Sequence, residues 1–277
     1  MNKSKITFTQ SGSGKKIILI HGYGGSVHHW DTVVPLLNTN FNVIVPNMTH
    51  LFMGKEAISF SKQIDQLADF LRENWRGQKF HFCGLSYGAA IVWGLSLRYP
   101  EMVEKVIFIN PMPPKPIEFF NWGIVKMVLA FPIPAFIMRL LFMTVIGKHF
   151  FKTATHIFRA EREHYKDRSY NLKGRKLDFL THITHRFSWI CRNENWSYWR
   201  DRMDQWIHPA MLIYDVKDPL FRNFSHEVFA EWFSCDYVVN LKGYGHIMTL
   251  ENGPKVSEYI NEFLDGSLSK IFQRRAS

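Results

Sequence analysis

Short, continuous apolar runs recur along this 277-residue chain, and they constrain its fold more than any other feature. Residues 15–20, 41–45 and 103–109 are such runs, and they are rich in β-branched side chains. Strands covered on both faces have this pattern, because side chains on both sides are then buried. Helical patterns, such as residues 61–75, lie between the runs. Strands that alternate with helices predict an α/β fold with a mostly parallel sheet.

A strongly apolar stretch, residues 119–146, interrupts this alternation. A single transmembrane helix is one interpretation of it. Pro132 and Pro134 divide the stretch, however, and Lys126 and Arg139 would lie at membrane depth. The sequence therefore predicts two short helices here.

Positive charge is concentrated in the same part of the chain. The formal net charge is +10, and residues 112–205 hold 16 Lys and Arg against 8 Asp and Glu. We expect residues 1–111 and 206–277 to form the core, with residues 112–205 as an inserted helical domain. Its basic character suits an acidic protein or an anionic membrane, although a solvated surface is the ordinary explanation. We expect no nucleic-acid partner.

The N-terminus and the cysteines bear on the compartment. The first residues contain no apolar signal-peptide core, and Cys83, Cys191 and Cys235 are widely spaced with no CxxC pair. We expect a cytoplasmic protein with reduced thiols.

Residues 84–88 read Gly-Leu-Ser-Tyr-Gly, between a strand-like run at 79–83 and a helix-like run at 89–95. A serine in such a strand-to-helix turn has a strained backbone and an exposed hydroxyl, and the glycines permit close packing. An ordinary turn is the simpler interpretation of the pentapeptide alone. The setting makes Ser86 a candidate nucleophile.

A glycine-rich turn, residues 21–25 (His-Gly-Tyr-Gly-Gly), closes the first strong apolar run. It lacks the Gly-Lys-Ser/Thr of a phosphate-binding loop. A plain strand-to-helix turn is the alternative to a functional one. We expect an oxyanion hole, with the backbone N–H groups of Tyr23 and Tyr87 as donors.

A base and an acid follow in order along the chain. Serine needs an imidazole to accept its proton, and the imidazole needs a carboxylate partner. His246 follows the last strand-like run, and Asp215 and Asp218 both follow an earlier one. We select Asp218 because it precedes Pro219, which gives the order Ser, Asp, His expected on such a sheet.

These segments resemble the signature segments of the α/β-hydrolase superfamily: residues 21–24, 84–88, 217–219 and 245–254. The resemblance implies a mostly parallel eight-stranded sheet, with a helical cap inserted after the sixth strand. It supports Ser86, Asp218 and His246 as the catalytic triad. Residues 47–54 depart from the Asp-x-Pro-Gly-x-Gly-x-Ser loop common in the superfamily, which leaves that loop's geometry open.

The first functional hypothesis is a serine hydrolase that cleaves the carboxylic ester of a lipophilic acyl substrate, through an acyl-enzyme and without a metal or other cofactor. An apolar cap predicts an apolar pocket. We expect substrate contacts from five residues: His21, Gly22, Gly24, Phe131 and Phe142.

Three alternatives stay open. The chain is similar in general plan to the pimeloyl-[acyl-carrier-protein] methyl ester esterases, so the basic cap could dock an acidic acyl carrier protein, with an ester or thioester as substrate. Action as a lipase at an anionic membrane surface is the second alternative. A binding protein that turns over slowly is the third.

Overall fold

A seven-stranded sheet forms the centre of the molecule in the computed structural model, which describes residues 6–54, 56–119, 123–144, 172–218, 220 and 223–268. The strand order is β1-β3-β2-β4-β5-β6-β7, with β1 antiparallel to β3 and every other pair parallel. The strands are β1 (Phe8–Ser11), β2 (Lys16–Ile20), β3 (Asn42–Pro46), β4 (Phe80–Leu85), β5 (Val103–Ile109), β6 (Ala210–Tyr214) and β7 (Tyr237–Asn240).

This sheet confirms the predicted α/β class and the mostly parallel topology. The expected number of eight strands is wrong for the described residues, which form seven. The insertion also leaves the sheet after the fifth strand, β5, and not after a sixth. One strand, β1, precedes the first parallel strand β2 within the described residues, and it pairs antiparallel with β3 at the edge of the sheet.

The apolar runs are continuous because helices cover both faces of the sheet. Along β2, Ile18 and Ile20 pack into one buried cluster, and Ile17 and Leu19 pack into the cluster on the opposite face. Successive strand residues point to opposite faces, so both sets must be apolar to be buried. Each fully buried aliphatic side chain of this kind contributes roughly 1.5–3 kcal/mol relative to an exposed one.

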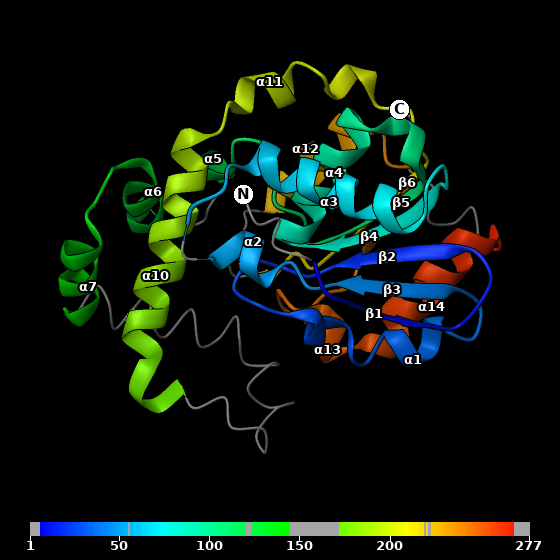
Figure 1. The fold of residues 1–277 in the computed structure, drawn as a ribbon, viewed down its shortest axis with the longest axis horizontal. Helices are drawn as coiled ribbons and strands as arrows, with labels where there is room; N and C mark the ends of the chain where they lie inside the picture. The colour runs from blue at the N-terminus through cyan, green and yellow to red at the C-terminus, as the bar shows by residue number, and fades with distance from the viewer. Residues whose placement is uncertain are drawn as a thin grey trace.

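The covering helices form two layers, which lie above and below the sheet in Figure 1. One face is covered by α3 (Phe60–Asn74), α4 (Tyr87–Arg98) and α12 (Asn223–Trp232), and the other by α1 (Val34–Leu37), α13 (Met248–Glu251) and α14 (Gly253–Asp265). Helix α3 starts where the sequence indicates, because the Ser59 hydroxyl accepts a hydrogen bond from the Lys62 N–H at 3.3 Å. Short elements complete the core: η1 (Val27–Trp30), α2 (Thr49–Met53) and η2 (Pro100–Met102).

The inserted segment between β5 and β6 is helical in its described part. Two short helices, α6 (Gly123–Ala130) and α7 (Ala135–Met143), are separated by Pro132 and Pro134, as predicted. In Figure 1 they pack on the long helix α10, on the side that faces away from the sheet. No helix in the described parts of the chain has the length and hydropathy needed to cross a bilayer. The segment also contains α5 (Pro116–Phe119), α10 (Leu172–Asn193), α11 (Trp196–Arg200) and η3 (Met203–Gln205).

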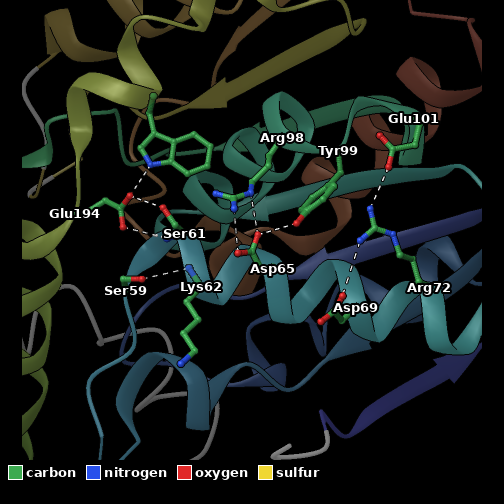
Figure 2. A network of polar contacts seen from close by, with 11 residues as sticks. Ser59, Ser61, Lys62, Asp65, Asp69, Arg72, Arg98, Tyr99, Glu101 and Glu194 are labelled. Carbon is green, nitrogen blue, oxygen red and sulfur yellow. Dashed lines mark hydrogen bonds and ion pairs between the residues drawn. The ribbon is translucent and has the colours of Figure 1, made fainter.

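The C-terminal end of α10 is fastened to the start of α3. The Glu194 carboxylate accepts hydrogen bonds from the Ser61 N–H and hydroxyl at 3.0 and 2.6 Å, at the helix N-terminus shown in Figure 2. The Trp199 indole N–H also donates to Glu194, at 2.8 Å. A negative charge at a helix N-terminus is favourable, because the helix dipole is positive there. The inserted segment therefore has a fixed attachment to the core.

Candidate active site

Ser86 stands in the turn between β4 and α4, with φ 56° and ψ −117°. Few non-glycine residues adopt a positive φ, and the strain is typical of functional turns. The turn is tight because glycines flank it. A Cβ on Gly88 would lie 2.2 Å from the Ile20 carbonyl oxygen, and a Cβ on Gly84 would lie 2.5 Å from the Ala89 backbone. No other residue type fits at these two positions without moving the backbone.

A continuous hydrogen-bonded relay leads from this serine to a carboxylate. His246 Nε2 lies 2.8 Å from Ser86 Oγ, and His246 Nδ1 lies 2.7 Å from Asp218 Oδ2. All three residues are buried. The Leu220 N–H donates to the other carboxylate oxygen, Asp218 Oδ1, at 2.7 Å. This arrangement fixes the Nδ1–H tautomer of His246 and leaves Nε2 to accept the serine proton.

Asp215, the alternative acid, has a different environment. Its carboxylate accepts hydrogen bonds from the backbone N–H groups of Gly243 and Gly245, the latter at 2.6 Å, in the loop that carries His246. It also accepts the Lys217 N–H at 2.8 Å. Asp215 therefore binds backbone, and Asp218 binds the imidazole. Pro219, on which the choice from sequence depended, lies outside the described residues.

The glycine-rich turn after β2 lies against the serine. A Cβ built on Gly22 would be 3.4 Å from the Ser86 Cβ. His21 is buried behind the turn, where it donates from Nδ1 to the Gly22 carbonyl at 2.9 Å and accepts the Met48 N–H at Nε2, 3.1 Å away. Burial lowers the pKa of His21 to about 3, so its ring is neutral. The His21 side chain thus supports the turn through both of its ring nitrogens.

His29 is a second support for this turn. Its Nδ1 accepts the Gly22 N–H at 3.3 Å, and the ring is buried. The ring has room there because Gly25 has no side chain and leaves the space that the ring fills. His28, by contrast, is partly exposed and contacts Asp31.

One candidate oxyanion donor follows Ser86 in its own turn, and the other belongs to the glycine-rich turn that lies against Ser86. Tyr87 is the first residue of α4, so its backbone N–H has no acceptor within the helix. Tyr23 follows Gly22 in the neighbouring turn, and the two tyrosine rings are 5.4 Å apart. Their hydroxyls point elsewhere: Tyr87 donates to Gln63 in the core, and Tyr23 donates to the Ile183 carbonyl in α10.

The remaining sequence candidates are spread over the inserted segment and the turn. Phe142 is buried in a cluster with Val128 and Met138 that packs against Tyr23. Phe131 is 59% exposed at the end of α6, so its side chain faces outward. Gly24 has φ 81°, which lets the glycine-rich turn reverse direction close to Ser86.

Asn110 is a residue of the site that the sequence did not predict. It follows β5 directly, is fully buried and contacts both the Asp215 loop and the His246 loop. Its only signal in the sequence was a polar residue at the carboxyl end of an apolar strand, next to the strand that leads to Ser86.

The arrangement combines a serine hydroxyl, an imidazole that can take its proton, a carboxylate that orients the imidazole, and backbone donors nearby. Such a set on a doubly covered parallel sheet defines the α/β-hydrolase class of site. The family model described as "Alpha/beta hydrolase family" matches residues 17–258. The chain belongs to this family.

Individual relatives are distant. The chain is similar to a soluble epoxide hydrolase of Corynebacterium sp. (strain C12), with 23% identity over 50% of this chain and 46% of the relative. It is also similar to a pimeloyl-[acyl-carrier protein] methyl ester esterase of Nitrosomonas europaea, with 23% identity over 40% of this chain and 42% of the relative. The alignments span less than half the length of these curated relatives. A thermophilic esterase of Thermogutta terrifontis has the same fold, with a TM-score of 0.68 and 17% identity over 95% of this chain and 94% of that one.

Proposed function

We propose that this protein is a serine hydrolase that cleaves carboxylic esters through a covalent acyl-enzyme, with Ser86 as nucleophile, His246 as base and Asp218 as acid. The observation that carries the proposal is the unbroken relay of 2.8 Å from Ser86 Oγ to His246 and 2.7 Å from His246 to Asp218. Serine is a weak nucleophile alone, and a hydrogen-bonded base of this kind activates it.

The reaction proceeds in two halves. Ser86 Oγ attacks the ester carbonyl carbon while His246 Nε2 takes the hydroxyl proton. His246 then gives that proton to the departing alkoxide, which leaves as the alcohol and produces the acyl-serine. A water molecule repeats the attack with His246 as base, and the acid and free Ser86 are formed. Asp218 stabilises the imidazolium in both halves.

Negative charge on the carbonyl oxygen is stabilised by the backbone N–H groups of Tyr87 and Tyr23. Tyr87 N–H lies at the positive end of the α4 dipole, which favours an oxyanion. The close approach of Gly22 to Ser86 brings the second turn within reach of the same oxygen. Preorganised donors of this type each account for roughly 100- to 1,000-fold in rate.

Residues 112–205 form the cap in this proposal, and residues 1–111 and 206–277 form the core. The cap contributes an apolar cluster, and Tyr23 of the core packs against it. An apolar cluster that packs against a residue of the glycine-rich turn favours a lipophilic acyl chain. The cluster consists of Val128, Met138, Phe142, Leu180 and Ile183.

A hydrolysis screen with p-nitrophenyl esters of increasing acyl length tests this function. We expect turnover that rises from acetate to a medium-length chain and is lost in Ser86→Ala. Ser96→Ala is a matched control, because the Ser96 hydroxyl donates to the Val92 carbonyl within α4. Equal turnover by Ser86→Ala and the wild-type protein would overturn the proposal.

A membrane surface as the source of substrate is a second candidate, favoured by the outer face of the cap. Nine large apolar side chains are exposed in the described residues, and six of them fall between residues 127 and 143. Exposed apolar patches mark interaction sites, and these side chains lie on or next to two successive helices that both pack on α10. The basic character of residues 112–205 suits an anionic leaflet. The six are Met127, Phe131, Phe136, Ile137, Leu140 and Met143.

Flotation with vesicles tests this candidate. We expect the protein to float with vesicles that contain anionic lipid and less with zwitterionic ones, and the double substitution Phe136→Ser/Leu140→Ser to abolish flotation. Ile207→Ser is the control, because Ile207 is 74% exposed outside this face. Equal flotation of all three proteins would contradict membrane docking by α6 and α7.

An acidic acyl carrier protein is the other partner that the basic cap suits. The support is the charge of residues 112–205 together with the named activity of the Nitrosomonas relative. Affinity for an acyl carrier protein should then fall steeply as salt is added, because exposed charges are screened. If the acyl group were hydrolysed equally fast with and without the carrier protein attached, a carrier-bound substrate would be contradicted.

A further inference from the structure

The chain segment that leaves β5 touches all three loops of the candidate triad. Asn110 is the first residue after the strand; it is fully buried, has φ 40°, and donates its backbone N–H to the Ile213 carbonyl at 2.9 Å. Asparagine tolerates this left-handed conformation better than most residues. The hydrogen bond to Ile213 therefore fixes the Asn110 backbone against β6, and the positive φ turns the chain there.

The Asn110 side-chain amide joins the acid loop to the base loop. Its Nδ2 donates to the carbonyl oxygens of Gly245 and His246, both at 2.9 Å. Its Oδ1 accepts the Asp215 N–H, also at 2.9 Å. Both amide hydrogens and the acceptor are thus used on backbone atoms of the two loops that carry His246 and Asp218.

The residues beside Asn110 connect the same segment to the nucleophile. The Ser86 N–H donates to the Ile109 carbonyl at 2.9 Å, and the Met112 N–H donates to the Ser86 carbonyl at 3.1 Å. Residues 109–112 therefore contact the backbone of Ser86 on one side, and those of Asp215 and His246 on the other. A shift of this segment would move the three loops relative to one another.

We propose that Asn110 is a positioning residue, which holds the His246 imidazole in line between Ser86 Oγ and Asp218 through its side-chain amide. The inference rests on the proposed roles of Ser86 and His246. The amide does not contact the reacting atoms. It fixes the carbonyl of His246 itself, so the ring's point of attachment cannot drift away from the two hydrogen bonds of 2.8 and 2.7 Å.

Two substitutions separate this role from a purely structural one. Asn110→Asp keeps the size, the acceptor and the tolerance of positive φ, but it turns a carboxylate oxygen toward the Gly245 and His246 carbonyls. Asn110→Gly keeps the backbone freedom and removes the amide. Asn74→Asp is the matched control, because the Asn74 amide donates to a single backbone carbonyl, Phe70, in α3 away from the site.

The experiment measures kcat and KM on a p-nitrophenyl ester, the melting temperature, and the low-field proton resonance of the His246 Nδ1–H, assigned by its loss in His246→Ala. We expect kcat of both Asn110 variants to fall about 100-fold per folded molecule, as displacement of a catalytic group by about 1 Å does. KM should change little, and the low-field resonance should shift or broaden. Asn74→Asp should match the wild type in kcat and in that resonance.

Wild-type kcat and an unchanged resonance in both Asn110 variants would overturn the inference. Failure of both variants to fold would also overturn it, because Asn110 would then be a requirement of the fold. Failure of the proposed function has a different signature, namely wild-type turnover in Ser86→Ala, whatever the Asn110 variants do.

Discussion

The Tyr23 hydroxyl donates a hydrogen bond to the backbone carbonyl of Ile183, 3.0 Å away, and so links the turn beside Ser86 to helix α10. A second contact also joins α10 to the core: His182 Nε2 lies 2.8 Å from the Met53 carbonyl oxygen at the end of α2. Tyr23, which is proposed to donate its N–H to the oxyanion, is therefore also one of the residues that join the inserted segment to the core. Tyr87, the other proposed donor, has its hydroxyl on Gln63 in the core, 2.9 Å away.

Tyr23→Phe should weaken discrimination between long and short acyl esters. The backbone N–H stays in place, but α10 loses its bond to the turn, and a hydrogen bond of about 1 kcal/mol corresponds to roughly fivefold in kcat/KM for long chains. Tyr87→Phe is the control. It should lower the free energy of unfolding by about 1–3 kcal/mol, because the buried Gln63 loses its partner, and leave the chain-length ratio unchanged. Equal effects of both substitutions on the ratio would contradict the link.

Asp218→Asn should lower kcat, whereas Asp215→Asn should lower the free energy of unfolding. Asp218→Asn removes the carboxylate that orients His246, so kcat should fall about 10,000-fold with little change in urea stability. Asp215→Asn places an amide against the Gly243 and Gly245 N–H groups, and it should lower the free energy of unfolding by about 1–3 kcal/mol. Kinetics and urea denaturation of both variants measure the difference. An Asp215→Asn protein that is as inactive as Asp218→Asn but fully stable would reverse the assignment.

Ser86→Gly should be more stable than Ser86→Ala. Both substitutions remove the nucleophile, but only glycine relieves the strain of φ 56° and ψ −117°. The expected difference in unfolding free energy is about 1–2 kcal/mol, reduced somewhat by the greater freedom of glycine in the unfolded chain. Parallel urea denaturation of the two proteins measures it. A Ser86→Ala protein of equal or greater stability would mean that the turn stores no strain.

Acid should destabilise the protein below about pH 6.5, because buried histidines must gain protons when it unfolds. Burial lowers the pKa of His21 to about 3 and that of His226 to about 4, from an ordinary value of 6.5. The unfolded chain therefore binds more protons between these values. The stabilisation is complete above pH 6.5 and is lost as the pH falls, by up to about 1.4 kcal/mol per pH unit for each histidine.

Urea denaturation at pH 7, 6, 5 and 4.5 tests this dependence. His21→Gln should reduce the slope of unfolding free energy against pH, because one histidine fewer takes up a proton on unfolding. A stability that stays constant from pH 7 to 4.5 would contradict the neutral state of these rings.

The sequence predicted the parallel sheet because strands covered on both faces need apolar residues at successive positions, as β2 has from Ile17 to Ile20. It also predicted the position of Ser86, because only a glycine-flanked turn lets α4 approach β2 as Gly88 does. The backbone contacts of Asn110 and Asp215 were not predictable. Each binds backbone atoms of loops that are distant in sequence, and a single polar residue after a strand has no periodicity that reveals such a contact.

Intact-mass analysis after reaction with a fluorophosphonate measures whether Ser86 is an activated nucleophile. We expect one adduct per chain, mapped to Ser86, absent in Ser86→Ala and formed much more slowly in His246→Ala. An adduct that forms at the wild-type rate in Ser86→Ala, or no adduct on the folded wild-type protein, would contradict that role of Ser86.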